Sequence, residues 1–312
     1  MSQAAALSAA PVSNPTLSKR AALVLFAIVI FTWGFNWTVT KLILQYGATP
    51  LWTIAIRSAI AAVFLLPLLM WKGELIVPRR GDWPVVISIG VLHMTAFAAL
   101  VGLGLSLIPA GRSIVLGYTT PLWVAPGAAL FLREKLTRMQ VVGVVLGIVG
   151  LALIFNPLAF DWSDRKALLG NALIMLAAFC WAASILHVRA HKWVSTPFQL
   201  VFWEVLLATV LLAVLALAVD GPPQIRWSVP VVLLFLYGGV IGVALAYWAM
   251  AMVNRSLPAV TTSIGILATP VVGVLSAMAV LGEPLSLPLV GAMLMIFGGI
   301  ALGTFDQWRR PG

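Results

Sequence analysis

Two charged side chains, Arg57 and Glu204, lie inside long apolar stretches of this sequence, at matching depths in the second and the seventh stretch. A charge in contact with lipid is costly, so each side chain should face other helices or a water-filled cavity. One interpretation is contact with a transported solute or a proton. The other is structural: a direct ion pair, or separate pairings within each half of the chain. The residues alone leave both open.

A histidine, His93, stands in the middle of the third apolar stretch, which has few other polar side chains. Imidazole titrates near neutral pH and both donates and accepts hydrogen bonds, so it could bind a solute. It could equally be satisfied by a neighbouring helix. An offset of 144 pairs His93 with Tyr237, and this pairing favours a cavity position for both side chains.

Two tryptophans, Trp33 and Trp181, fall near the middle of their stretches. Tryptophan usually collects at membrane interfaces, so a central position indicates either packing or a cavity wall. Asn36 and Ser184 follow three residues later, a spacing that places them on the same helix face as the tryptophans. An aromatic wall beside an amide or a hydroxyl suits a zwitterion with an apolar side chain. Trp248 lies nearer the end of its stretch, where an interface and a cavity are both reasonable.

Two prolines, Pro121 and Pro270, occupy the middles of the fourth and the ninth stretch. Proline removes one backbone hydrogen bond and bends a helix. The sequence therefore predicts paired kinks, which act as hinges, widen a cavity, or only shape the bundle.

The elements that must position these residues follow from composition. The chain has 312 residues, of which 62% are apolar and 9% charged, whereas soluble domains carry about 25% charged residues. The net charge of +10 resides in short loops, without a basic run interleaved with aromatics, so a nucleic-acid partner is not expected. The single cysteine, Cys180, excludes a disulfide framework. No metal and no cofactor are predicted; the expected partners are a lipid bilayer and a small-molecule substrate.

The apolar residues form runs long enough to cross about 30 Å of hydrocarbon as helices. The sequence predicts an all-α polytopic membrane protein in which residues 1–20 form a disordered cytoplasmic tail, followed by ten transmembrane helices. The expected spans are 21–43, 50–71, 83–106, 109–131, 138–156, 168–189, 197–219, 228–252, 257–281 and 286–306.

The positive charges also follow this arrangement. With the amino terminus in the cytoplasm, thirteen Lys and Arg residues lie inside and five outside, and Arg57 within a span completes the total of 19. Cytoplasmic loops carry the excess of positive charge in membrane proteins. Both termini are therefore predicted to be cytoplasmic.

An internal duplication divides the chain into two halves, 21–156 and 168–306. Laying Pro109–Leu136 over Pro258–Leu285, at an offset of 149, matches eight of 28 positions. Each half holds five predicted spans, and because five is odd the second half must be inverted relative to the first. Inverted repeats are an architecture of alternating access, with the substrate bound between the halves near the membrane midplane.

The chain resembles the EamA-type branch of the drug/metabolite transporter superfamily. The resemblance rests on Phe31–Asn36 (FTWGFN), Arg57, and two ordered copies of a Pro-Ala, Thr-Pro, Glu-x-Leu set within 109–136 and 258–285. It implies ten helices in two inverted five-helix repeats and solute transport, often export. Within this branch the chain is most similar to YddG-like exporters of aromatic and other neutral amino acids. It is accordingly expected in a bacterial inner membrane, and the oligomeric state stays open, a monomer included.

Other classes of function were weighed against this one. Export of lipophilic cations or multiple drugs remains an alternative, with Glu204 as the acidic group. An intramembrane enzyme is disfavoured because HExxH, GxSxG and paired intramembrane aspartates do not occur in the sequence. His187 and His191 have helical spacing but fall at the end of a span among bases, a poor setting for a metal site.

Overall fold

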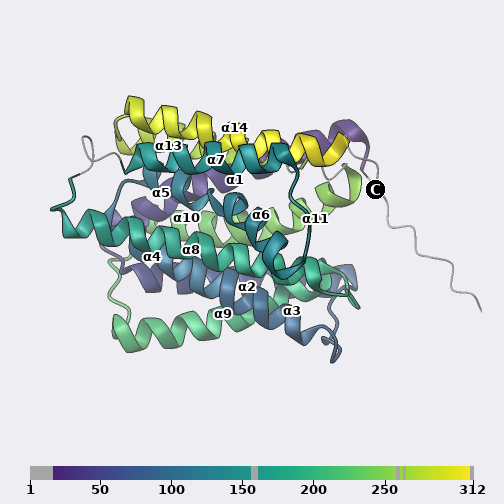
Figure 1. The fold of residues 1–312 in the computed structure, drawn as a ribbon. Helices are drawn as coiled ribbons and strands as arrows, with labels where there is room; N and C mark the ends of the chain where they lie inside the picture. The colour runs from purple at the N-terminus through teal and green to yellow at the C-terminus, as the bar shows by residue number, and fades with distance from the viewer. Residues whose placement is uncertain (1–16, 156–160, 258–260, 263–264, 310–312) are drawn as a thin grey trace, which may run out of the picture.

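The structure, a computed structural model, describes residues 17–155, 161–257, 261–262 and 265–309 and is helical throughout, with no strand in these ranges. Most of the predicted tail, residues 1–16, lies outside the described residues, and Lys19 already belongs to the first helix. In the first half the elements are α1 (Lys19–Gln45), α2 (Pro50–Lys72), α3 (Trp83–Ser88), η1 (Ile89–Phe97), α4 (Ala98–Leu107), α5 (Ala110–Gly117), α6 (Thr120–Phe131) and α7 (Arg138–Ile154). In the second half they are α8 (Arg165–Ala190), α9 (Pro197–Val219), α10 (Val229–Leu236), η2 (Tyr237–Leu245), α11 (Ala246–Ser256), α13 (Ala268–Leu281) and α14 (Leu287–Arg309) (Figure 1).

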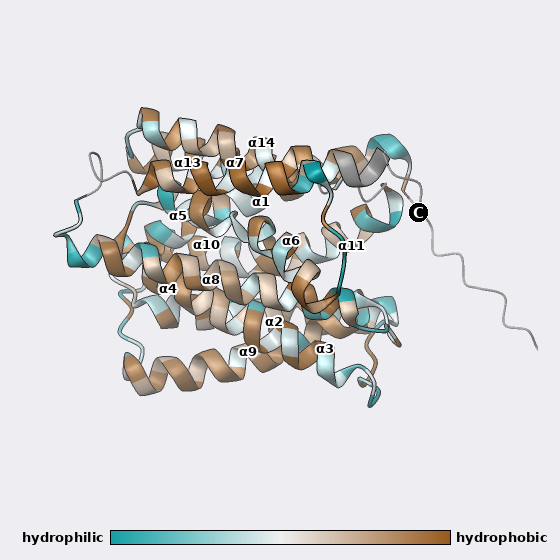
Figure 2. Ribbon diagram, in the orientation of Figure 1, coloured by the Kyte–Doolittle hydropathy of each residue, from teal (hydrophilic) through white to brown (hydrophobic). Residues whose placement is uncertain are grey.

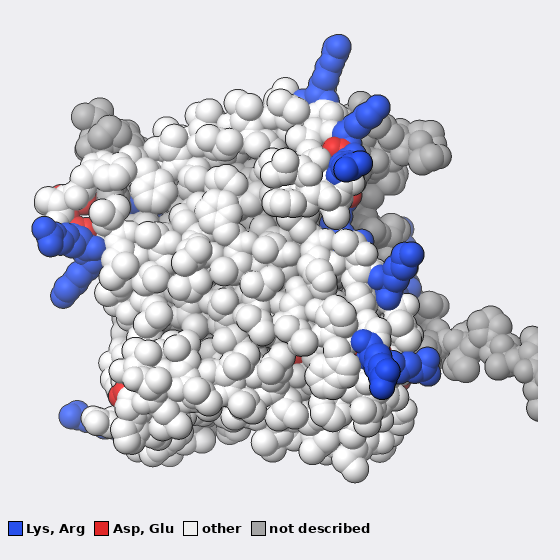
Figure 3. Space-filling view, turned by 60° about the horizontal axis from the view of Figure 1, so that its bottom comes forward, with Lys and Arg blue, Asp and Glu red and all other residues white. Residues whose placement is uncertain are grey.

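The helices form one bundle whose ends are polar and whose middle is apolar. Among the described residues, eight helical stretches are long and apolar enough to cross a membrane, and Arg138–Ile154 and Ala268–Leu281 are shorter apolar helices. Each of them overlaps one of the predicted spans, and the count of ten membrane crossings stays a prediction. Hydrophobic residues dominate the helices along their length (Figure 2), and Lys and Arg gather at two opposite ends with a band nearly free of charge between them (Figure 3). This distribution suits a multi-pass protein, because lipid stabilises an apolar belt and water the charged ends.

Local sequence explains where the long helices begin and end. The helix α9 starts with Pro197 in its first turn and a capping box in which Thr196 and Gln199 satisfy each other's backbone amides. Such a box supplies acceptors to the otherwise unpaired amides of the first turn. The helix α2 stops at Gly73, whose φ of 66° is readily adopted only by glycine.

The second helix of each half, α2 and α9, run antiparallel and are tied at both ends. The Leu51 amide donates to Asp220 Oδ2 at 3.2 Å, and Trp52 Nε1 donates to the carbonyl of Gly221 at 2.8 Å. At the other end Trp203 Nε1 donates to the carbonyl of Ile76 at 2.7 Å. Each helix is therefore anchored at its start to the segment that follows its partner's end.

The last helix of each half, α7 and α14, also pack antiparallel, through glycines. A Cβ on Gly143 would meet the backbone of Gly299, and a Cβ on Gly150 would lie 2.9 Å from the carbonyl oxygen of Ala292. The repeat offset of 149 relates Gly143 to Ala292 and Gly150 to Gly299. Exchanging the two halves therefore turns the Gly143–Gly299 contact into the Gly150–Ala292 contact. This is the contact pattern that two oppositely oriented copies produce.

Two membrane-crossing stretches depart from regular α-helix. Both third stretches contain a nine-residue π-helical segment, η1 and η2, related by an offset of 148; π-turns are frequent at functional sites. The fourth stretch breaks at Tyr118 and Thr119, and Pro121 lies in the first turn of α6, as Pro270 lies in the first turn of α13. Both prolines thus begin a helix rather than bend one from within, which is the position where a missing amide proton costs least. A hinge role for them stays a prediction.

Candidate functional site

A cavity of about 180 Å³ lies inside the bundle, between helices of both halves. Its wall is formed by α1, α2, η1, α4, the break after α5, α8, α9, η2 and α11. The residues that line it are Trp33, Asn36, Trp37, Thr40, Ile54, Arg57, Ser58, His93, Met94, Phe97, Ala98, Val101, Leu105, Tyr118, Trp181, Val205, Gly242, Val243 and Tyr247.

One side of the cavity is polar and centres on Arg57 of α2. The guanidinium donates through Nη1 to Thr40 Oγ1 at 2.5 Å and through Nη2 to Asn36 Oδ1 at 2.8 Å. Asn36 and Thr40 are one turn apart on α1, so both face Arg57. The side chain is only 6% exposed, and its Nε has no hydrogen-bond partner. A buried cation is therefore held by neutral acceptors alone.

Glycines of η2 make room for this arginine. A Cβ on Gly238 would lie 2.9 Å from Arg57 Cδ and closer still to its Nε, and a Cβ on Gly239 would lie 2.8 Å from the carbonyl oxygen of Arg57. Real Cβ atoms essentially never approach other atoms this closely. The position of Arg57 thus depends on the absence of a side chain at these two positions.

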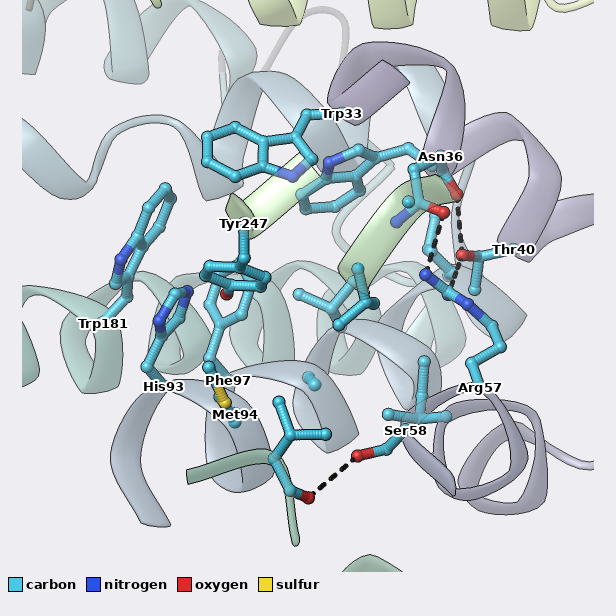
Figure 4. A pocket seen from close by; sticks show the side chains of 18 of the residues that line it. Trp33, Asn36, Thr40, Arg57, Ser58, His93, Met94, Phe97, Trp181 and Tyr247 are labelled. Carbon is cyan, nitrogen blue, oxygen red and sulfur yellow. Dashed lines mark hydrogen bonds between the residues drawn. The ribbon is translucent and has the colours of Figure 1, made fainter. Parts of the chain in front are cut away.

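The opposite side of the cavity is aromatic (Figure 4). The His93 ring from η1 stacks on Trp181 of α8, with centroids 5.1 Å apart and planes 3° from parallel. Phe97 lies 5.1 Å from Trp181, and Tyr118, at the break after α5, meets it edge-on at 5.8 Å. Offset and edge-on ring pairs of this kind are favourable beyond the area they bury. They form a rigid wall that suits another flat ring.

A second aromatic pair completes the cavity. Trp33 of α1 meets Tyr247 of α11 at 5.8 Å, and Tyr247 lies 6.4 Å from His93. The structure thus brings together Trp33, Trp181 and His93, the three aromatic candidates predicted at mid-depth.

Three other predicted residues lie outside the lining. Ser184 is buried in α8, and Tyr237 packs edge-on against Phe35 at 5.5 Å with its hydroxyl 3.5 Å from the carbonyl of Thr32. Trp248 packs near Lys72, whose Nζ lies 5.7 Å from the indole centroid. The two π-helical segments correspond at an offset of 148, so Ile241 rather than Tyr237 stands in the place of His93.

The predicted acidic partner, Glu204, is buried in α9 but does not line the cavity, and its Oε1 has no hydrogen-bond partner. No ion pair joins it to Arg57: among the residues that the structure describes, the ion pair present is Arg189–Glu134. The two residues nevertheless hold equivalent places. A Cβ on Gly90 of η1 would lie 3.3 Å from the carbonyl oxygen of Glu204, just as Gly238 of η2 adjoins Arg57. In this arrangement the direct ion pair is not formed.

Several lining residues escaped the sequence analysis. Thr40 had a usable signal, because it follows Asn36 by one helical turn. Tyr118 and Tyr247 had no such signal, because a single tyrosine in an apolar run does not indicate which face of the helix points into the cavity. The described part of the chain contains no cluster of three or more His, Cys, Asp or Glu side chains that could hold a metal.

The model of the EamA-like transporter family matches residues 20–156 and 168–305, most of the chain. This chain belongs to the EamA-like transporter family. The predicted resemblance is thereby confirmed, and the protein is a multi-pass membrane transporter, as its family and its apolar helices indicate.

The proteins that this chain is similar to carry several names. The chain is 24% identical to the uncharacterized transporter YvbV of Bacillus subtilis, over 92% of both chains. It is 28% identical to a probable amino-acid metabolite efflux pump of Salmonella typhimurium, covering 89% of this chain and 93% of that one. It is 29% identical to a riboflavin transporter of Vibrio cholerae, covering 72% and 74%. A solved structure, titled "Crystal structure of protein", shares the fold with a TM-score of 0.63 at 20% identity and covers 93% of this chain and 99% of its own.

Proposed function

We propose that this EamA-family transporter exports small aromatic amino acids and related metabolites from the bacterial cytoplasm by alternating access. In this proposal ten transmembrane helices form two inverted repeats, 21–156 and 168–306, and both termini are cytoplasmic. The substrate binds in the cavity between the repeats, and the helix breaks at Pro121 and Pro270 act as hinges.

The observation that carries the proposal is the pairing of a flat aromatic wall with a buried arginine across one small cavity (Figure 4). The stacked rings of His93 and Trp181 match the side chain of an aromatic amino acid. Arg57, steadied by Asn36 and Thr40, matches its carboxylate, because a guanidinium binds carboxylates through parallel hydrogen bonds. Both halves of the chain contribute, since His93 and Arg57 belong to the first and Trp181 and Tyr247 to the second.

The repeat geometry supports alternating access. The pairs α2–α9 and α7–α14 are antiparallel, and the α7–α14 contacts map onto each other at the offset of 149. A site between two oppositely oriented halves can face either side of the membrane when the halves exchange conformations.

Export of lipophilic cations is the alternative. It is disfavoured by Arg57, because a second positive charge entering the same low-dielectric cavity is repelled. Relatives named as amino-acid metabolite efflux pumps support the amino-acid substrate.

The test is transport by purified protein in proteoliposomes loaded with labelled Phe, Trp, Thr or tetraphenylphosphonium. Efflux of Phe and Trp that disappears in Trp181→Ala and persists in Trp71→Ala supports the proposal. Trp71 is a suitable control because its side chain is 81% exposed at the end of α2. Efflux of the cation alone would instead establish the multidrug alternative.

A further inference from the structure

The charge of the cavity wall is one-sided. Arg57 is a lining residue with a full positive charge, and none of the described lining residues is Asp or Glu. Glu204, the buried acid of the neighbouring helix, lies outside the lining. An empty cavity of this kind carries a positive charge that no protein group within it neutralises.

The hydrogen bonds of Arg57 leave donors for a ligand. A guanidinium has five N–H donors, and Arg57 uses one toward Thr40 and one toward Asn36. Both acceptors are neutral, so one further N–H on Nη1 and one on Nη2 stay uncommitted, whereas Nε is buried beside Gly238. A buried cation away from water is stabilised mainly by an anion with matching geometry. A substrate carboxylate supplies that anion.

A substrate ammonium group finds no carboxylate among the described lining residues, only uncharged oxygens such as those of Asn36, Ser58 and Tyr247. The polar oxygens nearest Arg57, Asn36 Oδ1 and Thr40 Oγ1, already accept hydrogen bonds from the guanidinium. The aromatic faces of Trp33 and Tyr247 could attract a cation weakly, but the arginine in the same cavity opposes it. The cavity wall therefore binds the carboxylate of a zwitterion and does not stabilise its ammonium group.

We propose that the substrate class is aromatic monocarboxylates, in which the carboxylate is the recognised charge and the α-ammonium group is dispensable. This rests on the proposed function, since it concerns the same cavity. Aromatic amino acids are then one group within a wider class that includes aryl acids without an amino group.

Three ligands of equal ring size separate the possibilities: phenylalanine, 3-phenylpropionate, which lacks the ammonium, and phenethylamine, which lacks the carboxylate. In proteoliposomes, counterflow of labelled Phe should be inhibited by 3-phenylpropionate at concentrations similar to those of unlabelled Phe, and not by phenethylamine. Labelled 3-phenylpropionate should itself be carried, and its uptake should respond to a valinomycin-imposed potassium potential, because the carried species has a net charge.

Variants test the residue that carries the argument. Arg57→Gln should weaken inhibition by both carboxylates at least about tenfold, the loss expected for a hydrogen bond to a charged group, and Arg57→Lys should restore part of it. Arg226→Gln, in the exposed loop between α9 and α10, is the charge-matched control and should behave as wild type. The ligand comparison on the wild-type protein needs no variant, so a poorly folding Arg57→Gln leaves the proposal testable.

Inhibition by phenethylamine but not by 3-phenylpropionate would overturn the inference while the proposed export of amino acids stood. Transport of 3-phenylpropionate without transport of Phe would support the inference and overturn the amino-acid function. Equal inhibition of well-folded Arg57→Gln and wild type would remove the arginine as the carboxylate site.

Discussion

A substitution that moves Arg57 without removing its charge tests the site most directly, and Gly238→Ala is such a change. The new Cβ would lie 2.9 Å from Arg57 Cδ and 3.2 Å from its Cγ. The closest approach is to Arg57 Nε. Ordinary non-bonded contacts are about 3.5–4.0 Å, so the side chain must retreat by roughly 1 Å or more. Overpacking of this size costs about 1–3 kcal/mol.

The displacement should also spoil substrate binding. The hydrogen bonds from Arg57 to Thr40 and Asn36 are 2.5 and 2.8 Å long, so a retreat of that size weakens both. A misplacement of about 1 Å in a binding group can reduce rates as much as 100-fold. We expect the KM for Phe efflux to rise about tenfold or more, with the maximal rate changed less.

The assay is initial Phe efflux from proteoliposomes over a range of internal concentrations, with thermal unfolding in detergent as a check on folding. Gly298→Ala is the matched control, because a Cβ there meets no atom within 4 Å and alanine favours helix. It should leave KM unchanged. A stable Gly238→Ala protein with the wild-type KM would refute the claim that the position of Arg57 determines carboxylate binding.

Four further predictions address other parts of the molecule. Trp181→Ala removes three aromatic contacts, each worth about 0.5–1.5 kcal/mol. Both the thermal unfolding midpoint and the affinity for Phe should therefore fall. A variant that kept the wild-type affinity would argue against the aromatic wall. Glu283→Ala removes the carboxylate that accepts the Ala110 and Gly111 amides at 2.7 and 2.8 Å. Loss of such a cap should lower the free energy of unfolding by about 1–2 kcal/mol, measured in detergent against the unmutated protein. Burial alone would raise the pKa of Asp82, but hydrogen bonds from Ser195 and from the Arg79 amide outweigh it and lower that pKa. The ionised carboxylate therefore stabilises the fold above its unfolded pKa, and this contribution is lost as the pH falls through the lowered pKa. Asp82→Asn should be less stable than the unmutated protein at neutral pH, and its stability should fall less steeply as the pH is lowered. Glu204→Gln should abolish any acceleration of Phe efflux by an imposed pH gradient if Glu204 carries protons, and an unchanged response would exclude that role.

The sequence was informative wherever one local pattern or one repeat carried the signal. Apolar runs predicted the helices, because about 20 apolar residues are stable only in lipid, and the duplicated Pro-Ala, Thr-Pro and Glu-x-Leu set predicted the family. Trp33, Trp181, Asn36, His93 and Arg57 were predicted as cavity candidates from polar or aromatic character at mid-depth, and the structure places all five around one cavity.

The same reasoning misplaced residues whose direction depends on helix geometry. Tyr237 was paired with His93 at an offset of 144, whereas the two π-helical segments correspond at 148, so it packs against Phe35 instead of taking the place of His93. Trp248 follows η2, whose π-helical turns change the angular step between residues and with it the face that a later side chain occupies. Arg57 and Glu204 are repeat equivalents in both sequence and packing, yet only Arg57 lines the cavity.

Glu134 and Glu283, which the repeat matches, separate what the sequence determines from what only the tertiary structure decides. Composition and duplication alone established a membrane-embedded helical chain built from two similar halves, because apolar length and repeated motifs are properties of the sequence itself. They also matched Glu134 with Glu283. Only the tertiary structure gave them different partners: Glu134 pairs with Arg189 at 2.8 Å, whereas Glu283 caps α5. The charges that meet depend on which helix ends the packed bundle brings within hydrogen-bond distance, and neither spacing nor composition fixes that.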